Sequence, residues 1–176
     1  KCLSNAFDGQ SNTYWQSEGP QPHKIDAQFM KRMPFSILAI YTDYKVDESY
    51  TPKKISIKAG NSVTSLKKFE DIELSDPNGW IIIPLYDKKR CEDEISASNG
   101  NFSIQSPSNL LEFPLCSFHF RLEIISNHQG GRDAHIRQIK LFANNKLMKE
   151  WENDQNESNS FSTSSFFMMN NTSQLR

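Results

Sequence analysis

Residues 118–124 read FHFRLEI, and this stretch decides the fold class that the sequence predicts. Every second residue in it is apolar, namely Phe118, Phe120, Leu122 and Ile124. Because successive side chains of a β-strand point to opposite faces, this alternation predicts a strand with one face on a core and the other toward water. A shorter strand of the same kind is predicted around Ile139 and Leu141.

The first half of the chain repeats this pattern. Alternating apolar residues occur at Ile25-Ala27-Phe29, Ile37-Ala39-Tyr41 and Ile55-Ile57-Ala59. Trp80-Ile81-Ile82-Ile83 is a continuous apolar run closed by Pro84, which predicts a strand buried on both faces. Gly, Pro and Asn turn signals separate these segments, and helical periodicity is almost lacking. The sequence therefore predicts an all-β fold, and the strand spacing fits a two-sheet jelly-roll sandwich.

The connection between the two strands first described is unusually rich in hydrogen-bonding groups. Residues 127–135 read NHQGGRDAH and contain no apolar residue larger than Ala. A plain hairpin turn would need only about two to five residues. Such a polar loop on a rigid sandwich edge is typical of a recognition loop, although a solvated loop without a role explains the composition equally well.

Two further polar runs contain aromatic residues. Residues 43–52 read DYKVDESYTP, and residues 13–17 read TYWQS. Tyrosines among small polar and acidic residues offer stacking surface and hydrogen bonds to an extended ligand. We expect Trp15 itself to pack in the core or at its rim. Alternate connections of a sandwich gather at one end, so we expect these two runs and residues 127–135 to converge on one site.

The composition narrows the functional class. The 176 residues suit a single domain, and 20 basic against 21 acidic residues give a net charge of −1. A broad phosphate-neutralising surface is therefore excluded, and we expect no nucleic-acid partner. No run approaches a membrane span, so no membrane association is expected. Cys2, Cys91 and Cys116 fit neither a zinc spacing nor a disulfide framework, which favours a reducing cytosolic or nuclear compartment.

Metal binding and catalysis have little support in the sequence. His128, Asp133 and His135 carry competent metal ligands, but their spacing matches no known metal motif. The acids of residues 43–52 likewise lack the spacing of a calcium loop. Common catalytic motifs do not occur, so we expect no enzyme activity and no cofactor.

Two polar regions flank or interrupt the predicted domain. Residues 87–109 predict a long insertion with the composition of a solvated or disordered excursion. We assign residues 1–145 to the sandwich and residues 146–176 to a flexible tail. Within the tail, Lys146 to Glu152 predict a short helix or edge segment. The apolar cluster Phe166-Phe167-Met168-Met169 is more typical of a docking peptide than of a spacer.

Four long strings of the chain resemble the Doc-domain family, that of subunit ten of the anaphase-promoting complex, the cell-cycle ubiquitin ligase. They are TYWQSEGPQPH (13–23), DYKVDESYTPKKI (43–55), DPNGWIIIPL (76–85) and NHQGGRDAHIRQIK (127–140). The resemblance covers roughly residues 8–85 and 115–143, and a fungal member is indicated.

The resemblance implies a galactose-binding-like jelly roll without catalytic activity. It implies a role in cell division and mitosis as a co-receptor for the destruction-box degron, together with a propeller coactivator, which raises substrate affinity and processive ubiquitination. It also implies location in the nucleus and cytoplasm. The family tail ends Ile-Arg and docks on a tetratricopeptide-repeat scaffold subunit, and Leu175-Arg176 is a conservative departure from that end. The alternative function is a sugar- or lipid-binding module of the same sandwich class.

The resemblance also names site residues, with Ser49 and residues 128–133 as the strongest candidates. The degron-facing residues implied are Asp47, Glu48, Ser49, Tyr50, His128, Gln129, Arg132, Asp133 and His135. Under this interpretation the two histidines are hydrogen-bonding or loop-shaping residues and not metal ligands. We expect Gly131 to set the turn, while Gly130 replaces an Asn of other members and removes one side-chain contact.

Overall fold

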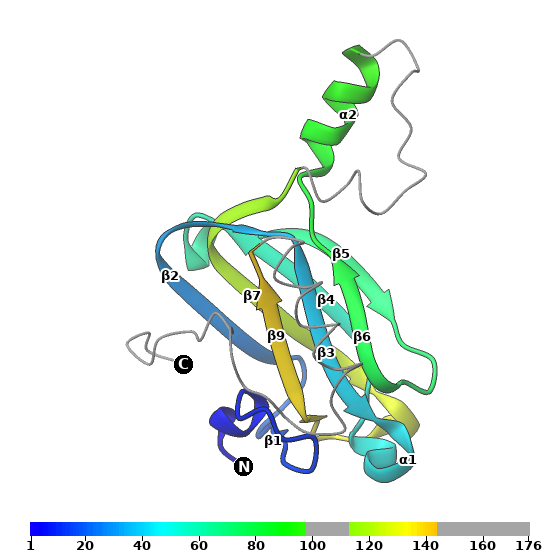
Figure 1. Cartoon of the computed structure of the whole chain (residues 1–176). Helices are drawn as coiled ribbons and strands as arrows, with labels where there is room; N and C mark the ends of the chain where they lie inside the picture. Colours follow the sequence, from blue (N-terminus) through cyan, green and yellow to red (C-terminus); the bar gives the residue numbers. More distant parts are fainter. Residues whose placement is uncertain (98–112, 144–176) are drawn as a thin grey trace, which may run out of the picture.

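The computed structural model describes residues 1–97 and 113–143, which form a sandwich of antiparallel sheets (Figure 1). One sheet has the strand order β2-β7-β4-β5, the facing sheet has the order β6-β3-β9, and β1 and β8 form a two-stranded pair at one end. The strands are β1 (Trp15–Gln16), β2 (His23–Phe35), β3 (Ile37–Asp43), β4 (Pro52–Gly60), β5 (Lys67–Glu73), β6 (Asn78–Pro84), β7 (Leu115–Asn127), β8 (His135–Ile136) and β9 (Gln138–Phe142).

The core lies between the two larger sheets, as the alternating patterns predicted. Leu122 of β7 pairs with Ile25 of β2 and with Ile57 of β4, and all three side chains belong to the same buried cluster. Leu38 and Ile40 of β3 join this cluster from the facing sheet. The prediction of an all-β sandwich is therefore confirmed. The alternating pattern named the wrong face of β3, because the core takes Leu38 and Ile40 and not the predicted Ile37-Ala39-Tyr41 set.

The prediction for residues 80–83 was wrong in one respect. These residues lie in β6, which forms the edge of its sheet and pairs with β3. Ile83 is buried in the core, whereas Ile82 points to the other side and is 38% exposed. A continuous apolar run does not reveal that its strand is at an edge, so burial on both faces did not follow.

Short helices occupy the connections. They are η1 (Leu3–Ala6), α1 (Tyr44–Asp47), η2 (Glu48–Tyr50), η3 (Val63–Ser65), α2 (Lys88–Ala97) and η4 (His128–Gly130). Helix α2 projects away from the sandwich in Figure 1. It lies at the start of the predicted insertion, residues 87–109, for which the sequence analysis predicted no helix. The Asp87 carboxylate accepts a hydrogen bond from the Arg90 amide at 3.2 Å and so caps this helix.

Three remaining predictions concern the chain as a whole. Among residues 1–97 and 113–143, no helix has the length and apolar character needed to cross a membrane. Cys2, Cys91 and Cys116 are free thiols. The rest of the insertion, residues 98–109, and the whole predicted tail, residues 146–176, lie outside the described residues.

Candidate functional site

The three polar runs meet at one end of the sandwich, as predicted. The ring of His135 lies between two tyrosines, with its centroid 4.0 Å from that of Tyr14 and 4.3 Å from that of Tyr50. Residues 13–17, 43–52 and 127–135 therefore each contribute one ring to the same stack. We call the surface formed by these three runs the composite surface.

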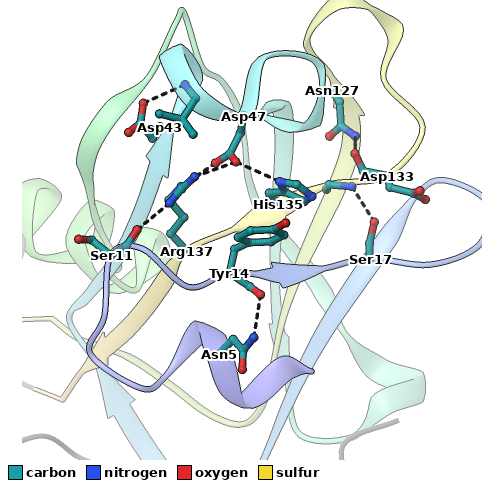
Figure 2. Close-up of polar contacts among 12 residues, drawn as sticks. Asn5, Ser11, Tyr14, Ser17, Asp43, Asp47, Asn127, Asp133, His135 and Arg137 are labelled. Carbon is teal, nitrogen blue, oxygen red and sulfur yellow. Dashed lines mark hydrogen bonds and ion pairs between the residues drawn. The ribbon is translucent and has the colours of Figure 1, made fainter. Parts of the chain in front are cut away.

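A buried carboxylate joins the runs beneath this surface (Figure 2). Asp47 ends α1 and is only 5% exposed. The guanidinium of Arg137 donates to both of its oxygens, from Nε at 2.7 Å and from Nη2 at 2.9 Å, and His135 Nδ1 donates at 3.0 Å. Arg137 Nη1 also donates to the Ser11 carbonyl at 2.8 Å. We call the side chains of Asp47, His135 and Arg137 the Asp47 clamp. Together with the Ser11 carbonyl, the clamp connects three distant parts of the chain.

The charges in the Asp47 clamp favour the ionised carboxylate. Burial alone would raise the pKa of Asp47, but hydrogen bonds from His135 and Arg137 and the guanidinium charge outweigh burial, so the pKa lies below its ordinary value. The hydrogen bonds to Asp47 raise the pKa of Arg137 above its ordinary value. Both partners are therefore charged at neutral pH, and the bidentate geometry fixes their mutual orientation.

The backbone of the 127–135 loop is held by the side chains of Ser17, which follows β1, of His23 at the start of β2 and of Asn127 at the end of β7. Ser17 Oγ accepts from the Ala134 amide at 2.7 Å, and His23 Nε2 donates to the Arg132 carbonyl at 2.7 Å. Asn127 Nδ2 donates to the Asp133 carbonyl at 2.7 Å (Figure 2). Because these bonds use backbone groups, they fix the path of the loop and leave its exposed side chains available for a ligand.

The structure separates the roles of the two loop glycines, Gly130 and Gly131. Gly130 has a φ of +69°, in the left-handed region, and therefore shapes the turn. Gly131 has an ordinary φ of −57°, but a Cβ at this position would overlap the Ser49 carbonyl oxygen. The prediction that Gly131 sets the turn was wrong, because its role is to let two backbones touch.

A family comparison identifies this arrangement. The model of the family described as "Anaphase-promoting complex, subunit 10 (APC10)" matches residues 3–172. The chain belongs to this family. The match includes residues that carry the composite surface and continues into the part of the chain beyond Ala143, outside the described residues.

Several members of the subunit 10 family are similar to the chain. The human "Anaphase-promoting complex subunit 10" is 38% identical over 135 residues, which are 77% of this chain and 61% of the human protein. The Dictyostelium discoideum protein of the same name is 43% identical, over 77% of this chain and 60% of its own length. "Anaphase-promoting complex subunit DOC1" of Saccharomyces cerevisiae is 34% identical, over 78% and 47%. The chain thus spans about half to three-fifths of the length of these relatives, and a fungal origin stays a prediction.

Solved structures confirm the jelly-roll fold. A family 32 carbohydrate-binding module from Clostridium perfringens NanJ, in complex with galactose, superposes with a TM-score of 0.54 at 16% identity, over 78% of this chain and 82% of that chain. An F5/8 type C domain from Bacteroides fragilis gives 0.53 at 12% identity, over 80% of each chain. Similarity at this low identity carries the galactose-binding-like fold and not the ligand.

The nine residues predicted to contact a degron differ in how far their side chains are exposed to solvent. Glu48, Tyr50, Gln129 and Arg132 are exposed, Ser49 and Asp133 are half-buried, and Asp47, His128 and His135 are buried. The exposed and half-buried side chains have access to a ligand. The buried ones hold the loops that carry the exposed ones, which agrees with the loop-shaping role expected for the two histidines.

The three side chains that could in principle bind a metal, those of His128, Asp133 and His135, do not form a cluster. His135 Nδ1 bonds Asp47, whereas the Nδ1 of His128 lies 3.9 Å from Asp76. Figure 2 shows the Asp133 carboxylate pointing away from His135. Within residues 1–97 and 113–143, no group of three or more His, Cys, Asp or Glu side chains is arranged to hold a metal ion.

A fourth connection, before β6, belongs to the site and was not predicted. The Tyr44 amide donates to the Pro77 carbonyl at 3.0 Å, and Asp76 approaches His128. Glu48, Gln129 and Asp76 are the residues other than glycine with positive φ in the described ranges, at 45°, 52° and 44°. Uncommon backbone conformations of this kind gather at binding sites, where surrounding contacts must hold them.

Arg137 is the other residue of the site that the sequence did not reveal. It follows His135 by two positions, so both side chains are on the same side of the extended chain. This two-residue spacing was the feature of the sequence that could have pointed to Arg137 as part of the site. The partner of Arg137, however, lies 90 positions earlier in the chain, and no local pattern connects them.

Proposed function

We propose that the chain is a non-catalytic substrate-recognition subunit of the anaphase-promoting complex ubiquitin ligase, acting in cell-cycle protein degradation. Membership of the subunit 10 family supports the proposal that the chain is part of the anaphase-promoting complex. The geometry of the composite surface supports the proposal that it recognises a substrate. The single observation that carries the proposal is the convergence of three polar runs on loops held by a buried ion pair. Rigid loops of this kind lower the entropy cost of binding, which is what a recognition surface requires.

In the proposed mechanism, an extended destruction-box degron binds reversibly across the composite surface. Tyr50, 42% exposed and backed by His135, offers an apolar ring with a polar hydroxyl. Arg132 offers a guanidinium for a carboxylate or carbonyl, and the Gln129 amide can both donate and accept hydrogen bonds. Asp47, Arg137 and His135 act as positioning residues and keep their partners within the protein.

The proposal extends to partners and location. A propeller coactivator would share the degron, which raises affinity and lengthens the time a substrate stays bound during ubiquitin transfer. Leu175-Arg176, outside the described residues, would dock on a tetratricopeptide-repeat scaffold subunit through an apolar side chain and a guanidinium. We propose that the protein acts in the nucleus and the cytoplasm.

The test is a reconstituted ubiquitination assay with the full chain. The variant Ser49→Ala, Gln129→Ala, Arg132→Ala removes polar groups from the composite surface and leaves the Asp47 clamp in place. We expect weaker degron binding, by about tenfold or more, and shorter ubiquitin chains per encounter, because each lost ligand contact contributes on the order of 1 kcal/mol.

A matched control lies at the opposite end of the sandwich. Asn61, Thr64 and Lys67 are exposed in the connection after β4 and at the start of β5, so their triple alanine variant removes comparable polar surface there. It should leave affinity and chain length unchanged. Unchanged processivity in the composite-surface variant, with the complex assembled normally, would reject the proposed site.

A further inference from the structure

Strand β2 carries a large bulge at the edge of its sheet. Gln28 pairs with His119 of β7, and the next pair along the two strands is Met33 with Ser117. Residues 29–32 of β2 therefore lie opposite a single residue of β7. Because β2 is the outermost strand of the β2-β7-β4-β5 sheet, these extra residues project from the edge of the sandwich. We call residues 29–32 the β2 bulge.

The β2 bulge is held at both of its ends. The ring of Phe29 packs against the core, with its centroid 5.0 Å from that of Phe35. At the other end, Arg32 Nε donates a hydrogen bond to the Cys116 carbonyl at 3.3 Å. These two contacts give the bulge a defined position relative to the sheet, so the side chains between them are presented in a fixed place.

The side chains between the two contacts face water. Met30 is 99% exposed, and Lys31 is exposed beside it. Within residues 1–97 and 113–143, neither Lys31 nor Arg32 forms an ion pair. Basic residues in a bulge protect an edge strand from pairing with another chain, but that protection needs no exposed methionine. Methionine adapts to irregular apolar surfaces and is enriched at protein interfaces.

A pocket lies directly beside the β2 bulge. Its volume is about 360 Å³, and its walls come from β2, from β7 and from the connection between β4 and β5. Gln28, the last paired residue before the bulge, is part of the wall. Pockets that bind ligands start at about 300 Å³, so this one has room for a large side chain of a partner.

The pocket combines apolar walls with neutral polar groups. Val63, which is 52% exposed, lines it from the β4–β5 connection, and Gln28 and His119 supply hydrogen-bonding groups. Asp26 is the acidic residue of the wall. Arg121 donates to both of its carboxylate oxygens, from Nε at 2.5 Å and from Nη2 at 2.9 Å. The one carboxylate of the pocket is therefore compensated within the protein and does not repel an anion.

We propose that the β2 bulge and the pocket beside it bind an acidic peptide segment of a partner protein. In this arrangement, carboxylates of the segment pair with Lys31 and Arg32, an apolar part of the segment covers Met30, and one large apolar side chain fills the pocket. Charge complementarity identifies the class of partner, because basic groups without ion-pair partners stand next to a pocket whose own carboxylate is compensated.

The proposed site lies at the end of the sandwich opposite the composite surface. Pro52 at the start of β4 pairs with Asn127, next to the composite surface, whereas Gly60 at the end of β4 pairs with His119 of the pocket. At about 3.3 Å per residue, the length of β4 places the two sites about 25 Å apart. The chain can therefore bind a degron and an acidic segment at the same time, and the proposal is independent of degron binding.

The test uses the full chain and a displayed library of random short peptides. The chain should enrich peptides that combine several Asp or Glu residues with one large apolar residue. One enriched peptide, made with a fluorescent label, is the probe for titration. The variant Met30→Ser, Lys31→Ser removes two exposed side chains and should fold like the unaltered chain, but it should bind the probe at least about tenfold more weakly.

Lys45→Ser, Val46→Ser is the matched control, because it removes one exposed basic and one exposed apolar side chain at the other end of the sandwich. It should bind the probe normally. Val63→Asp places a carboxylate at the pocket and should weaken binding by about tenfold, which would show that pocket and bulge act together. Raising the salt from about 0.1 M to about 1 M should also weaken binding, because the Debye length falls from about 10 Å to about 3 Å.

A library that yields no acidic peptides would overturn the proposal, and so would equal probe affinities of the Met30→Ser, Lys31→Ser variant and the unaltered chain. Two further measurements test other occupants of the site. If vesicles of phosphatidylcholine and phosphatidylserine bind in place of acidic peptides, and the variant loses this binding, the bulge contacts an anionic membrane. If sedimentation shows dimers that the variant loses, the bulge contacts a second copy of the chain. Either result would overturn the proposal.

Discussion

Asp47 is the side chain on which the contacts of the composite surface converge. It accepts from Arg137 twice and from His135 once, and it is almost fully buried. Removing a carboxylate from water is costly, and the cost is offset only when its hydrogen-bonding capacity is met by charged partners. The Asp47 clamp meets that condition, so it can hold the loops in place while Tyr50 and its neighbours remain exposed.

Asp47→Asn should therefore lower the free energy of unfolding by about 3–5 kcal/mol at neutral pH, because it leaves the Arg137 charge buried without its counter-charge. The folded pKa of Asp47 lies below the ordinary 3.8, so its stabilisation is complete above that pH and is lost as the pH falls through the folded pKa. Urea unfolding of both proteins should show a difference that narrows on acidification. Asp71→Asn removes a surface ion pair with Lys68 and should have little effect at any pH. A constant difference across the pH range would contradict the assigned role.

The same residues show what a sequence can reveal about a site. Tyr14, Tyr50 and His135 were expected to converge, because sandwich topology alone brings alternate connections to one end. The pairing of Asp47 with Arg137 was not expected. It depends on which strand face each side chain occupies and on the turn geometry of α1, and neither property is encoded in the spacing of the two residues. Long-range ion pairs are therefore the part of such a site that only coordinates supply.

Two short helices, η2 and η4, form the centre of the composite surface. The His128 amide donates to the Thr51 carbonyl at 2.9 Å, and Gly131 lies directly against the Ser49 carbonyl. Backbone contact at this distance leaves no room for a side chain. The two elements are therefore packed directly against each other, which links the degron contacts proposed for residues 48–50 to those proposed for residues 128–133.

Gly131→Ala should separate η2 from η4, because its methyl group would meet backbone and not a flexible side chain. We expect a loss of about 2 kcal/mol or more in the free energy of unfolding and a matching loss of degron affinity. Gly130→Ala is the matched control, since its Cβ would meet nothing within 4 Å and only the left-handed backbone is penalised, by about 1 kcal/mol. Denaturant unfolding of the two variants decides the question. Equal effects would mean that the close approach does not hold the elements together.

Strand burial was predictable where it depends on alternation and unpredictable where it depends on topology. Phe120, Leu122 and Ile124 of β7 are buried as expected, because the pattern is local to the strand. Phe118, the first residue of the predicted pattern, is only half-buried. Ile82 is exposed because β6 is an edge strand, and Ala39 is buried although it points away from the core. Edge position and the burial of an outward-pointing residue are properties of the assembled sheet, so a run of apolar residues cannot distinguish them.

The composite surface and the point where the chain leaves the last strand lie at different ends of the molecule. The composite surface lies at the end where β4 begins and β7 ends, whereas strand β9 carries the chain toward the other end before the tail starts (Figure 1). A net charge of −1 contributes little to long-range attraction between the chain and a partner. The proposed degron recognition and the proposed attachment to the complex would therefore rest on specific short-range contacts.

Removal of Leu175-Arg176 should weaken the proposed assembly into the ligase and leave the stability of the sandwich unchanged, because the core cluster of the sandwich is built from residues between Ala6 and Ile139. Loss of one apolar anchor and one bidentate guanidinium should lower affinity for the repeat subunit by about a hundredfold, equivalent to about 2.8 kcal/mol. Calorimetric titration with that subunit measures the loss, and denaturant unfolding should give the same free energy as the unaltered chain. Deleting Ser158-Asn159 shortens the tail equally but keeps its end, so it serves as the control and should bind normally. If both deletions weaken binding alike, tail length and not the terminal dipeptide governs attachment.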